Sequence, residues 1–154
     1  MIEIITFDEK YKDDVVEMIE DIYENELGFI GYDRPDIYSI TETYLKKLNS
    51  SFWLALNDGK LIGAVGILEK TEKLAYIKRL VVKKEFRRQG LGQKLLQTVL
   101  SFAKEHGFNT IYAGTVEENQ NAIKFYESQG FAREDNVPED ITAASDSICL
   151  RFNL

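Results

Sequence analysis

The residues best suited to chemistry form a basic turn with two glycines, Arg87-Arg88-Gln89-Gly90-Leu91-Gly92. An apolar strand ending at Leu80-Val81-Val82 runs into this turn, and an amphipathic helix follows it. A strand-to-helix joint of this kind directs successive backbone N–H groups toward one point at the positive end of the helix, where a phosphate group can bind. The two glycines let the backbone approach the anion without an intervening side chain. The turn therefore predicts a phosphorylated ligand.

Two familiar phosphate-binding loops do not fit this spacing. A dinucleotide-binding fingerprint requires a third glycine, and the sequence has Leu95 at that position. An NTPase loop requires a Gly-Lys-Ser/Thr ending, whereas the sequence reads Gly92-Gln93-Lys94. Spacing alone leaves two interpretations of the Arg-x-x-Gly-x-Gly turn: an anion site of another type, or an ordinary tight turn.

A second motif runs from Asn119 to Phe131 and reads Asn-Gln-Asn-Ala-Ile-Lys-Phe-Tyr-Glu-Ser-Gln-Gly-Phe. The basic turn resembles the acyl-CoA signature of the GNAT superfamily of N-acetyltransferases. The second motif resembles that family's Asn-x-x-Ala-x-x-x-Tyr helix, which ends in Gly-Phe. Two motifs in the family's order are more specific than either one alone. The resemblance is strongest over 74–132, and it implies a single acetyltransferase domain over residues 1–154.

The resemblance implies that coenzyme A binds along the turn and the strand before it. The pyrophosphate would bind backbone N–H groups from Arg88 to Lys94, and the pantetheine arm would pair with the strand as an extra strand would. Asn119 would hydrogen-bond the same arm, and the basic side chains would assist the phosphates or only face solvent. The residues expected to bind the cofactor are Leu80, Val81, Val82, Arg87, Arg88, Gln89, Gly90, Leu91, Gly92, Gln93, Lys94, Asn119, Ala122 and Tyr126.

The activity that the resemblance implies is transfer of an acetyl group from acetyl-CoA to a primary amine, by direct attack within a ternary complex. Tyr126 matches the family's general acid, which protonates the departing thiolate, although its ring could instead only pack a short helix. A backbone N–H at Val81 or Val82 would polarise the thioester carbonyl. The alternative is a non-catalytic acyl-CoA-binding or sensing module of the same fold.

The general base is not identified by the sequence. Many relatives carry a glutamate on the strand before the turn, but Leu74 to Val82 contains no carboxylate, and Tyr76 stands near the expected position. The missing glutamate is the main support for the non-catalytic alternative. A water chain or a carboxylate from another element would have to accept the proton. The carboxylates considered are Glu26, Asp33, Asp36 and Glu69, and none is assigned.

Acceptor specificity is expected in the loop 24–38, because the family binds its substrate there. The loop is aromatic and acidic, which suits a cationic amine partly enclosed by rings. Arg34-Pro35-Asp36 indicates an internal ion pair, or an arginine available to a substrate carboxylate. The residues expected to bind the acceptor are Glu26, Phe29, Tyr32, Asp33, Arg34, Asp36 and Tyr76. A small amine, a polyamine, an amino acid and a protein N-terminus all remain open, as does an ordinary surface connection.

The elements around these motifs follow from hydrophobic spacing. Strands are expected at 2–7, 51–57, 60–70, 74–84, 109–116, 131–134 and 147–153, with a type I′ hairpin turn at Asp58-Gly59. Helices are expected at 9–26 with Asp8 as N-cap, at 37–49, from Leu91 to His106-Gly107, and at 120–129. This order, an α/β (α+β) pattern, predicts a mixed, mostly antiparallel sheet of six to seven strands with helices on both faces.

Composition narrows the function classes. The net charge is −7. Residues 1–50 hold 13 Asp or Glu against 5 Lys or Arg, whereas residues 70–94 hold 9 Lys or Arg against 2 Asp or Glu. The acidic balance and the short basic block disfavour a nucleic-acid partner. No run is apolar enough for a membrane span, and no signal peptide is expected.

The remaining reactive side chains are not expected to take part in catalysis. Cys149, the single cysteine, is expected to be buried in an apolar strand, and His106 is expected to cap the end of a helix. No Cys/His cluster indicates a metal. A chain with one cysteine and no leader is expected to be cytoplasmic. A homodimer is an expectation of the family resemblance alone.

Overall fold

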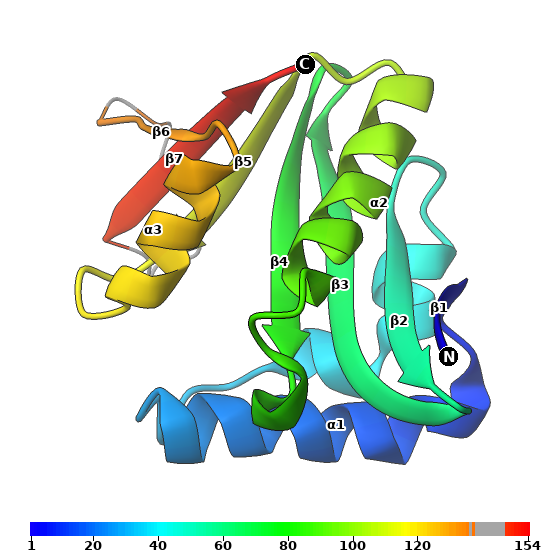
Figure 1. The fold of residues 1–154 in the computed structure, drawn as a ribbon. Helices are drawn as coiled ribbons and strands as arrows, with labels where there is room; N and C mark the ends of the chain where they lie inside the picture. The colour runs from blue at the N-terminus through cyan, green and yellow to red at the C-terminus, as the bar shows by residue number, and fades with distance from the viewer. Residues whose placement is uncertain (136, 138–146) are drawn as a thin grey trace.

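The computed structural model describes residues 1–135, 137 and 147–154. Its centre is a seven-stranded sheet in the order β1-β2-β3-β4-β5-β7-β6 (Figure 1). All neighbouring strands are antiparallel except β4 and β5, which are parallel. The predicted mixed, mostly antiparallel sheet is therefore confirmed. The strands are β1 Ile2–Thr6, β2 Ser51–Asn57, β3 Lys60–Thr71, β4 Leu74–Val82, β5 Thr110–Thr115, β6 Ala132–Arg133 and β7 Ile148–Asn153.

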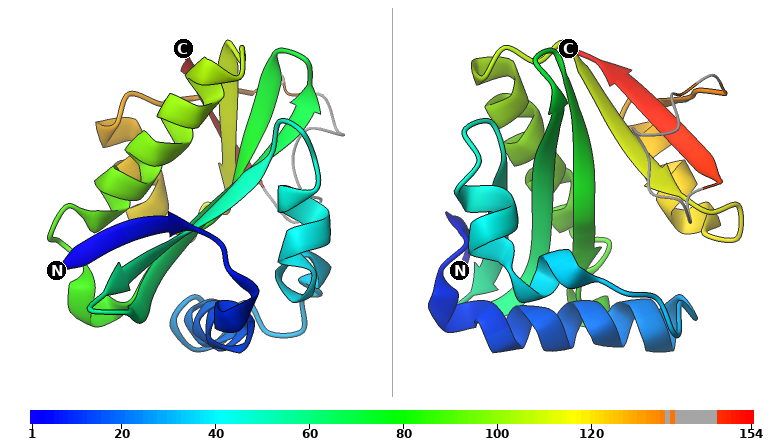
Figure 2. Two further views of the ribbon diagram at one scale, coloured as in Figure 1. Left: turned by 90° about the vertical axis from the view of Figure 1, so that its right-hand side faces the viewer. Right: turned by 180° about the vertical axis from the view of Figure 1, so that it is seen from behind.

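Helices cover both faces of the sheet, as predicted (Figures 1 and 2). The helices α2 (Leu91–Glu105) and α3 (Gln120–Ser128) lie on one face. The helix α1 (Lys12–Asp21) lies on the other, preceded by the short 3-10 turn η1 (Glu9–Tyr11) and continued by the π-helical turn η2 (Ile22–Glu26). Three further short segments are η3 (Pro35–Tyr38), η4 (Thr41–Leu45) and η5 (Lys84–Phe86). No helix in the described ranges is long and apolar enough to cross a membrane.

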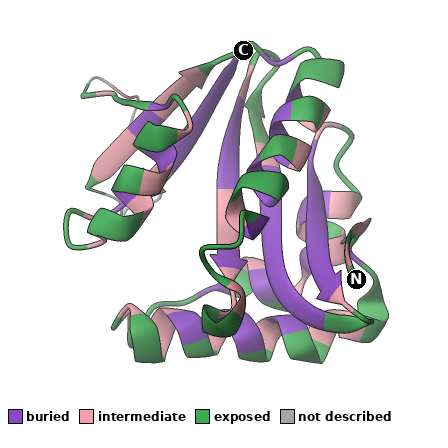
Figure 3. Cartoon of the chain, viewed as in Figure 1, coloured by how far each residue is buried: buried purple, intermediate pink, exposed green. Residues whose placement is uncertain are grey.

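Alternating side chains of β2 belong to two separate hydrophobic cores. Trp53 packs with Leu95 of α2, whereas Phe52 and Leu54 pack with Ile19 of α1. Successive strand residues point to opposite faces, so a strand covered on both sides is buried along nearly all of its length. Figure 3 shows this burial across β2, β3 and β4. The central strands are thereby fixed in position beneath the site.

Local signals agree with the structure except in one helix. Asp8 accepts a hydrogen bond from Lys10 N–H as N-cap, and Asp58 and Gly59 take φ of 50° and 82°, which fit the type I′ turn. The single helix predicted at 37–49 is wrong: η3 ends at Tyr38, Ser39 leaves the helical conformation with φ of −143° and ψ of 50°, and the short π-helical turn η4 follows. The Ser39 hydroxyl bonds Pro35 O, a local contact that competes with the helix. The polar segment predicted at 135–146 falls almost entirely outside the described residues.

The strands β4 and β5 pair along only part of their length. Their register runs from Leu74 opposite Thr110 to Ile77 opposite Ala113 and then stops. Beyond this point the two strands diverge like the arms of a V (Figure 1). The second half of β4 carries a bulge, because Lys78 pairs with Gly66 of β3 and Val81 with Ala64, which leaves an extra residue on β4. The end of β4 before the basic turn thus has an open edge on the β5 side.

Candidate active site

A cleft of about 1220 Å³ lies where β4 and β5 diverge. It is lined by β4, the basic turn, the start of α2, the end of β5, α3, and the segment from η2 through the following loop. A site for one small molecule typically measures about 300–1,000 Å³. The cleft is therefore larger than a typical site for one small molecule, and it brings the two sequence motifs and the predicted acceptor loop into one site.

All residues expected to bind the cofactor line this cleft except Gln89 and Lys94. The Gln89 side chain turns back to Glu85 O at 3.4 Å. Lys94 is exposed, and its N–H donates to Gly90 O at 3.1 Å as the first hydrogen bond of α2. These two residues shape the turn without lining the space in front of it.

The turn has the backbone conformation that an anion site requires. Arg88 and Gly90 take φ of 61° and 80°, both left-handed, immediately before α2 begins at Leu91. Because the first helical hydrogen bond comes from Lys94, the N–H groups of Leu91, Gly92 and Gln93 have no partner within the helix. These N–H groups form the positive end of α2, which borders the cleft.

Arg87 has a structural role that the motif did not reveal. Its Nε donates to Val82 O at 2.8 Å, and its Nη1 pairs with Glu26 Oε1 at 2.6 Å. The first contact ties the turn to β4, and the second ties it to the end of η2. Glu26, expected to bind the acceptor, is thus already paired with an arginine.

The open edge of β4 presents specific backbone groups to the cleft. Lys83 N–H donates to Ile62 O of β3 at 2.8 Å, so Lys83 directs its backbone groups toward β3. Backbone groups alternate along a strand, so those of Val82 point to the open edge and those of Val81 toward β3. The bond from Arg87 to Val82 O agrees with this alternation.

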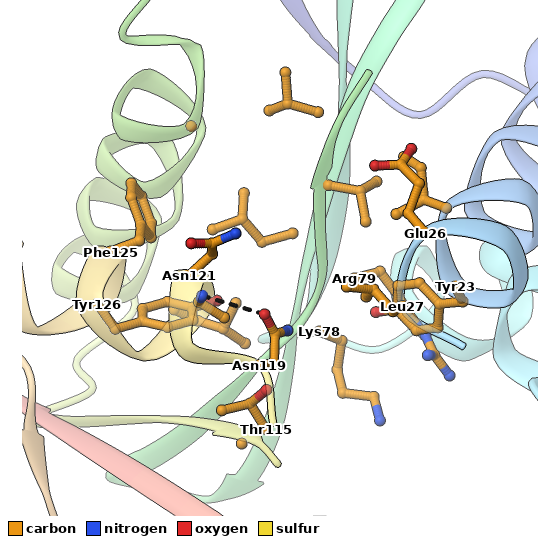
Figure 4. A pocket seen from close by; sticks show the side chains of 18 of the residues that line it. Tyr23, Glu26, Leu27, Lys78, Arg79, Thr115, Asn119, Asn121, Phe125 and Tyr126 are labelled. Carbon is orange, nitrogen blue, oxygen red and sulfur yellow. Dashed lines mark hydrogen bonds between the residues drawn. The ribbon is translucent and has the colours of Figure 1, made fainter. Parts of the chain in front are cut away.

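The second motif forms the wall that faces β4 across the cleft. Asn119 caps α3, because its side-chain oxygen accepts the Ala122 N–H at 3.3 Å (Figure 4). Tyr126 is buried and packs against Phe125 and Phe131, with ring centroids 5.4 and 5.1 Å away. Figure 4 shows Asn119, Phe125 and Tyr126 on one wall, and Tyr23, Glu26 and Arg79 on the other. The predicted general acid therefore lines the cleft on the side away from the acceptor loop.

Every residue expected to bind the acceptor lines the cleft, but the ion pair predicted within Arg34-Pro35-Asp36 is wrong. Arg34 turns toward α1, where it pairs with Glu20 at 2.6 Å and with Glu24 at 3.6 Å. Its side chain is only 3% exposed, so a substrate carboxylate cannot reach it easily. Asp36 turns the other way, toward β4. The two oppositely charged side chains thus bind different elements instead of each other.

Asp36 forms a two-pronged ion pair with Arg79. Nε and Nη2 of Arg79 lie 3.0 and 2.7 Å from the two carboxylate oxygens, and the Tyr44 hydroxyl donates to Oδ2 at 2.7 Å. Burial would raise the pKa of Asp36, but the hydrogen bonds and charge of Arg79 outweigh it and lower the pKa below the ordinary 3.8. Burial, and then the charge of Asp36, raise the pKa of Tyr44 well above its ordinary value. Asp36 is therefore a weak proton acceptor.

The other candidate carboxylates for the general base differ in their partners and in their distance from the cleft. Glu26 pairs with Arg87, and Glu69 is exposed, bonded to Asn49 at 2.5 Å and absent from the cleft lining. Asp33 lines the cleft and has no hydrogen bond or ion pair within the described residues. Tyr76, which stands near the position expected for a glutamate, is buried, with the ammonium groups of Lys70 and Lys78 5.8 and 5.5 Å from its ring centre. Asp33 is thus the carboxylate left available in the cleft.

Several cleft residues were missed by sequence reasoning, among them Lys78, Arg79, Asn121 and Phe125. Arg79 is the most consequential, and only the general basic character of 70–94 pointed toward it. No local pattern marks the bulge that turns its side chain to the cleft. His106 and Cys149 do not line the cleft. A ring nitrogen of His106 lies 2.8 Å from Phe102 O, which confirms the capping prediction. Cys149 packs against the cluster of Tyr76 and Tyr112 but is only partly buried, so its expected burial is confirmed in part.

Known proteins resemble this chain both in sequence and in structure. A model of the acetyltransferase (GNAT) family matches residues 13–131. A probable N-acetyltransferase camello from Xenopus laevis is 35% identical over 113 residues, which cover 70% of this chain and 52% of that protein. N-acetyltransferase 8 from Homo sapiens is 35% identical over 103 residues, which cover 64% of this chain and 45% of that protein. The chain thus spans about half the length of the curated relatives it matches.

Solved structures match over nearly the whole chain. An acetyltransferase of the GNAT family from Staphylococcus aureus Mu50 is 30% identical with a TM-score of 0.91, and the match covers 99% of both chains. The PaiA N-acetyltransferase from Thermoplasma acidophilum, solved in complex with coenzyme A, is 23% identical with a TM-score of 0.79, and the match covers 100% of this chain and 99% of that one. The second likeness supports the fold alone. With the family model spanning both motifs, these matches establish that the chain belongs to the GNAT acetyltransferase family.

Proposed function

We propose that this protein is an acetyl-CoA-dependent N-acetyltransferase that acts on a primary amine. The observation that carries the proposal is the single cleft in which the left-handed turn at Gly90, the open edge of β4 and the buried Tyr126 all meet. The turn suits a pyrophosphate, the edge suits an amide-bearing chain, and the phenol suits a departing thiolate.

The residues present fit coenzyme A. A Cβ built at Gly90 would meet no other atom within 4 Å in the described structure, so the space in front of the turn is open, and the left-handed φ favours glycine. The N–H groups of Leu91, Gly92 and Gln93 would hold the pyrophosphate, with Arg88 beside them. Leu80 and Val82 would pair with the pantetheine arm, and the Asn119 amide would donate to it. Acetyl-CoA supplies the activated thioester.

The chain's own residues supply the rest of the chemistry. Of the two N–H groups expected from the sequence to polarise the thioester, that of Val81 points toward β3. That of Val82 points to the open edge, where it would bind the pantetheine arm, so neither is assigned to the thioester oxygen. Tyr126 would give its phenolic proton to the sulfur as the carbon–sulfur bond breaks. The proton lost by the amine would pass to Asp33 or to a water beside it. Direct attack needs no covalent enzyme intermediate, and Cys149 lies away from the cleft.

The acceptor would enter from the loop side of the cleft. Phe29 packs edge-on against Tyr32, with ring centroids 6.0 Å apart, and both rings line the cleft with Asp33. Rings beside a free carboxylate favour an amine that carries positive charge. Small amines, polyamines, amino acids and peptide N-termini all fit this description. A homodimer and a cytoplasmic location stay predictions.

Two measurements test the proposal. Thermal unfolding with increasing coenzyme A should show stabilisation that follows ligand concentration by mass action. Release of free thiol from acetyl-CoA should then depend on one or more members of a panel of primary amines. Tight coenzyme A binding with no turnover of any amine would instead favour the non-catalytic module, which the absence of a carboxylate on β4 supports.

A further inference from the structure

Arg79 occupies a backbone conformation that is costly for any residue with a side chain. It lies in the bulge of β4 with φ of 57°, in the left-handed region. Its side chain is only 12% exposed, and it holds Asp36 through two hydrogen bonds. Strained residues persist where the surrounding contacts determine their conformation, and such positions cluster at functional sites. The contacts of Arg79 therefore indicate why its strained backbone conformation is maintained.

The second contact of Arg79 is the ring of Tyr23 in η2. The Arg79 guanidinium carbon lies 5.2 Å from the ring centre, and the Arg34 guanidinium carbon lies 5.0 Å from it. Arg34 in turn pairs with Glu20 and donates to Phe29 O. Tyr23 is thus in contact with two buried arginines, one from β4 and one from the acceptor loop.

These contacts fix both ends of the loop that lines the acceptor side. Near its start, Phe29 O accepts from Arg34 and the Phe29 ring packs against Tyr23 with centroids 6.0 Å apart. At its end, Asp36 is held by Arg79 and Tyr44. The tip between these anchors, 30–33, is exposed, with Ile30 74% and Tyr32 55% exposed, and Tyr32 and Asp33 line the cleft.

We infer that Arg79 is a positioning residue for the acceptor amine. It binds Asp36 and Tyr23 from the bulge in β4, and so it sets the loop 28–36, with Tyr32 and Asp33 at its tip, at a fixed distance from the open edge of the same strand. One strand thereby carries the donor-binding edge and the anchor of the acceptor loop. This inference rests on the proposed function, since it assigns the acceptor to this loop.

The test uses two substitutions that remove the anchor in different ways. Arg79→Gly removes the guanidinium while glycine keeps the left-handed φ without strain, so the bulge and the β4 edge should persist. Asp36→Asn removes the partner charge and leaves Arg79 in place. Arg79→Lys keeps the charge but not the two-pronged geometry. Arg133→Met is the matched control, because Arg133 forms an ion pair with Glu117 that is exposed and outside the cleft.

For both anchor variants, we expect the amine KM to rise about 10-fold or more, because displaced contacts weaken substrate alignment. The coenzyme A Kd should stay within about threefold, and Arg79→Lys should be intermediate. Amide hydrogen exchange should accelerate more in 28–36 than in 87–105, where any increase should only follow the loss of global stability. The Arg133 control should match the unaltered protein in all three measurements.

Hydrogen exchange requires no turnover, so it tests the anchoring of the loop 28–36 separately from the acetyltransferase activity. Unchanged exchange in 28–36 in both variants would overturn the positioning role. Equal losses of coenzyme A and amine binding would also overturn it, since Arg79 would then support the bulge and not the loop. Failure of the unaltered protein to acetylate any amine would overturn the proposed function, and with it the assignment of this loop to the acceptor.

Discussion

Gly90 and Gly92 lie two residues apart in the turn, yet alanine should have opposite effects at the two positions. Gly90 takes φ of +80°, and a Cβ there would meet no other atom within 4 Å in the described structure. The cost of Gly90→Ala is therefore backbone strain without a clash, about 1–2 kcal/mol. For a protein of this size that lowers Tm by about 2–8 °C.

The same strain should appear in coenzyme A binding. If the free variant relaxes out of the left-handed conformation, Tm falls less, and binding must instead restore that conformation at a cost of up to about 1–2 kcal/mol. The Kd should then rise about 5- to 30-fold. Gly92 lies inside α2, where a Cβ would contact the Phe125 ring at an ordinary 3.5 Å. Gly92→Ala should therefore raise stability by about 0.4–1 kcal/mol and leave the Kd within about threefold.

Thermal unfolding with and without coenzyme A, together with calorimetric titration, measures both quantities. The informative result is the contrast between the two variants. A Gly90→Ala variant with unchanged Tm and Kd would show that the left-handed turn is not needed for binding. A Gly92→Ala variant that loses both stability and affinity would refute the steric reasoning, since it would mean that the two glycines serve one purpose.

Three further outcomes are expected. Tyr126→Phe should lower kcat by about 10²- to 10⁴-fold with little change in coenzyme A Kd, provided that chemistry limits turnover; an unchanged kcat would remove Tyr126 from the mechanism. Asp36→Asn should cost about 3–5 kcal/mol of unfolding free energy at neutral pH, because Arg79 is left buried without its partner. Folding lowers the pKa of Asp36, so its contribution to stability is complete above pH 3.8 and is lost as the pH falls below that value. The unfolding free energies of the variant and the unaltered protein should therefore converge in acid. A difference that stays constant with pH would show that the Asp36 charge does not provide this stability. Leu95→Ala, at a fully buried position of α2, should cost about 2–5 kcal/mol in urea unfolding, and a loss below about 1 kcal/mol would show that the core collapses around the gap.

Local signals in the sequence predicted the sheet and the donor side of the site. The Asp58-Gly59 turn, the Asp8 cap and the amphipathic stripe from Leu91 each act over a few residues, so each can be recognised without the fold. The glycine turn and the Tyr126 helix belong to the same class of signal. The helix predicted at 37–49 failed because Ser39 bonds a nearby carbonyl, an alternative to the helix that apolar spacing does not reveal.

The acceptor side depends on contacts between distant residues and was less predictable. Arg34 and Asp36 are close in sequence, and an ion pair between them was the natural expectation. Their actual partners are Glu20 and Arg79, which no local pattern connects to them. The bulge that places Arg79 is likewise set by pairing with β3. Residues of the acceptor loop could be predicted from the sequence, but their charges could not be assigned to partners.

The divergence of β4 and β5 also bears on how the protein avoids aggregation. An unpaired strand edge is a template for other chains, and soluble proteins usually block or shorten such edges. Here the exposed edge of β4 is short, interrupted by the bulge, and recessed between two walls of the cleft. A single narrow chain can reach it, whereas the edge of another sheet, with its side chains on both faces, cannot. The same geometry that admits a ligand chain therefore hinders edge-to-edge pairing of β4 with the sheet of another molecule.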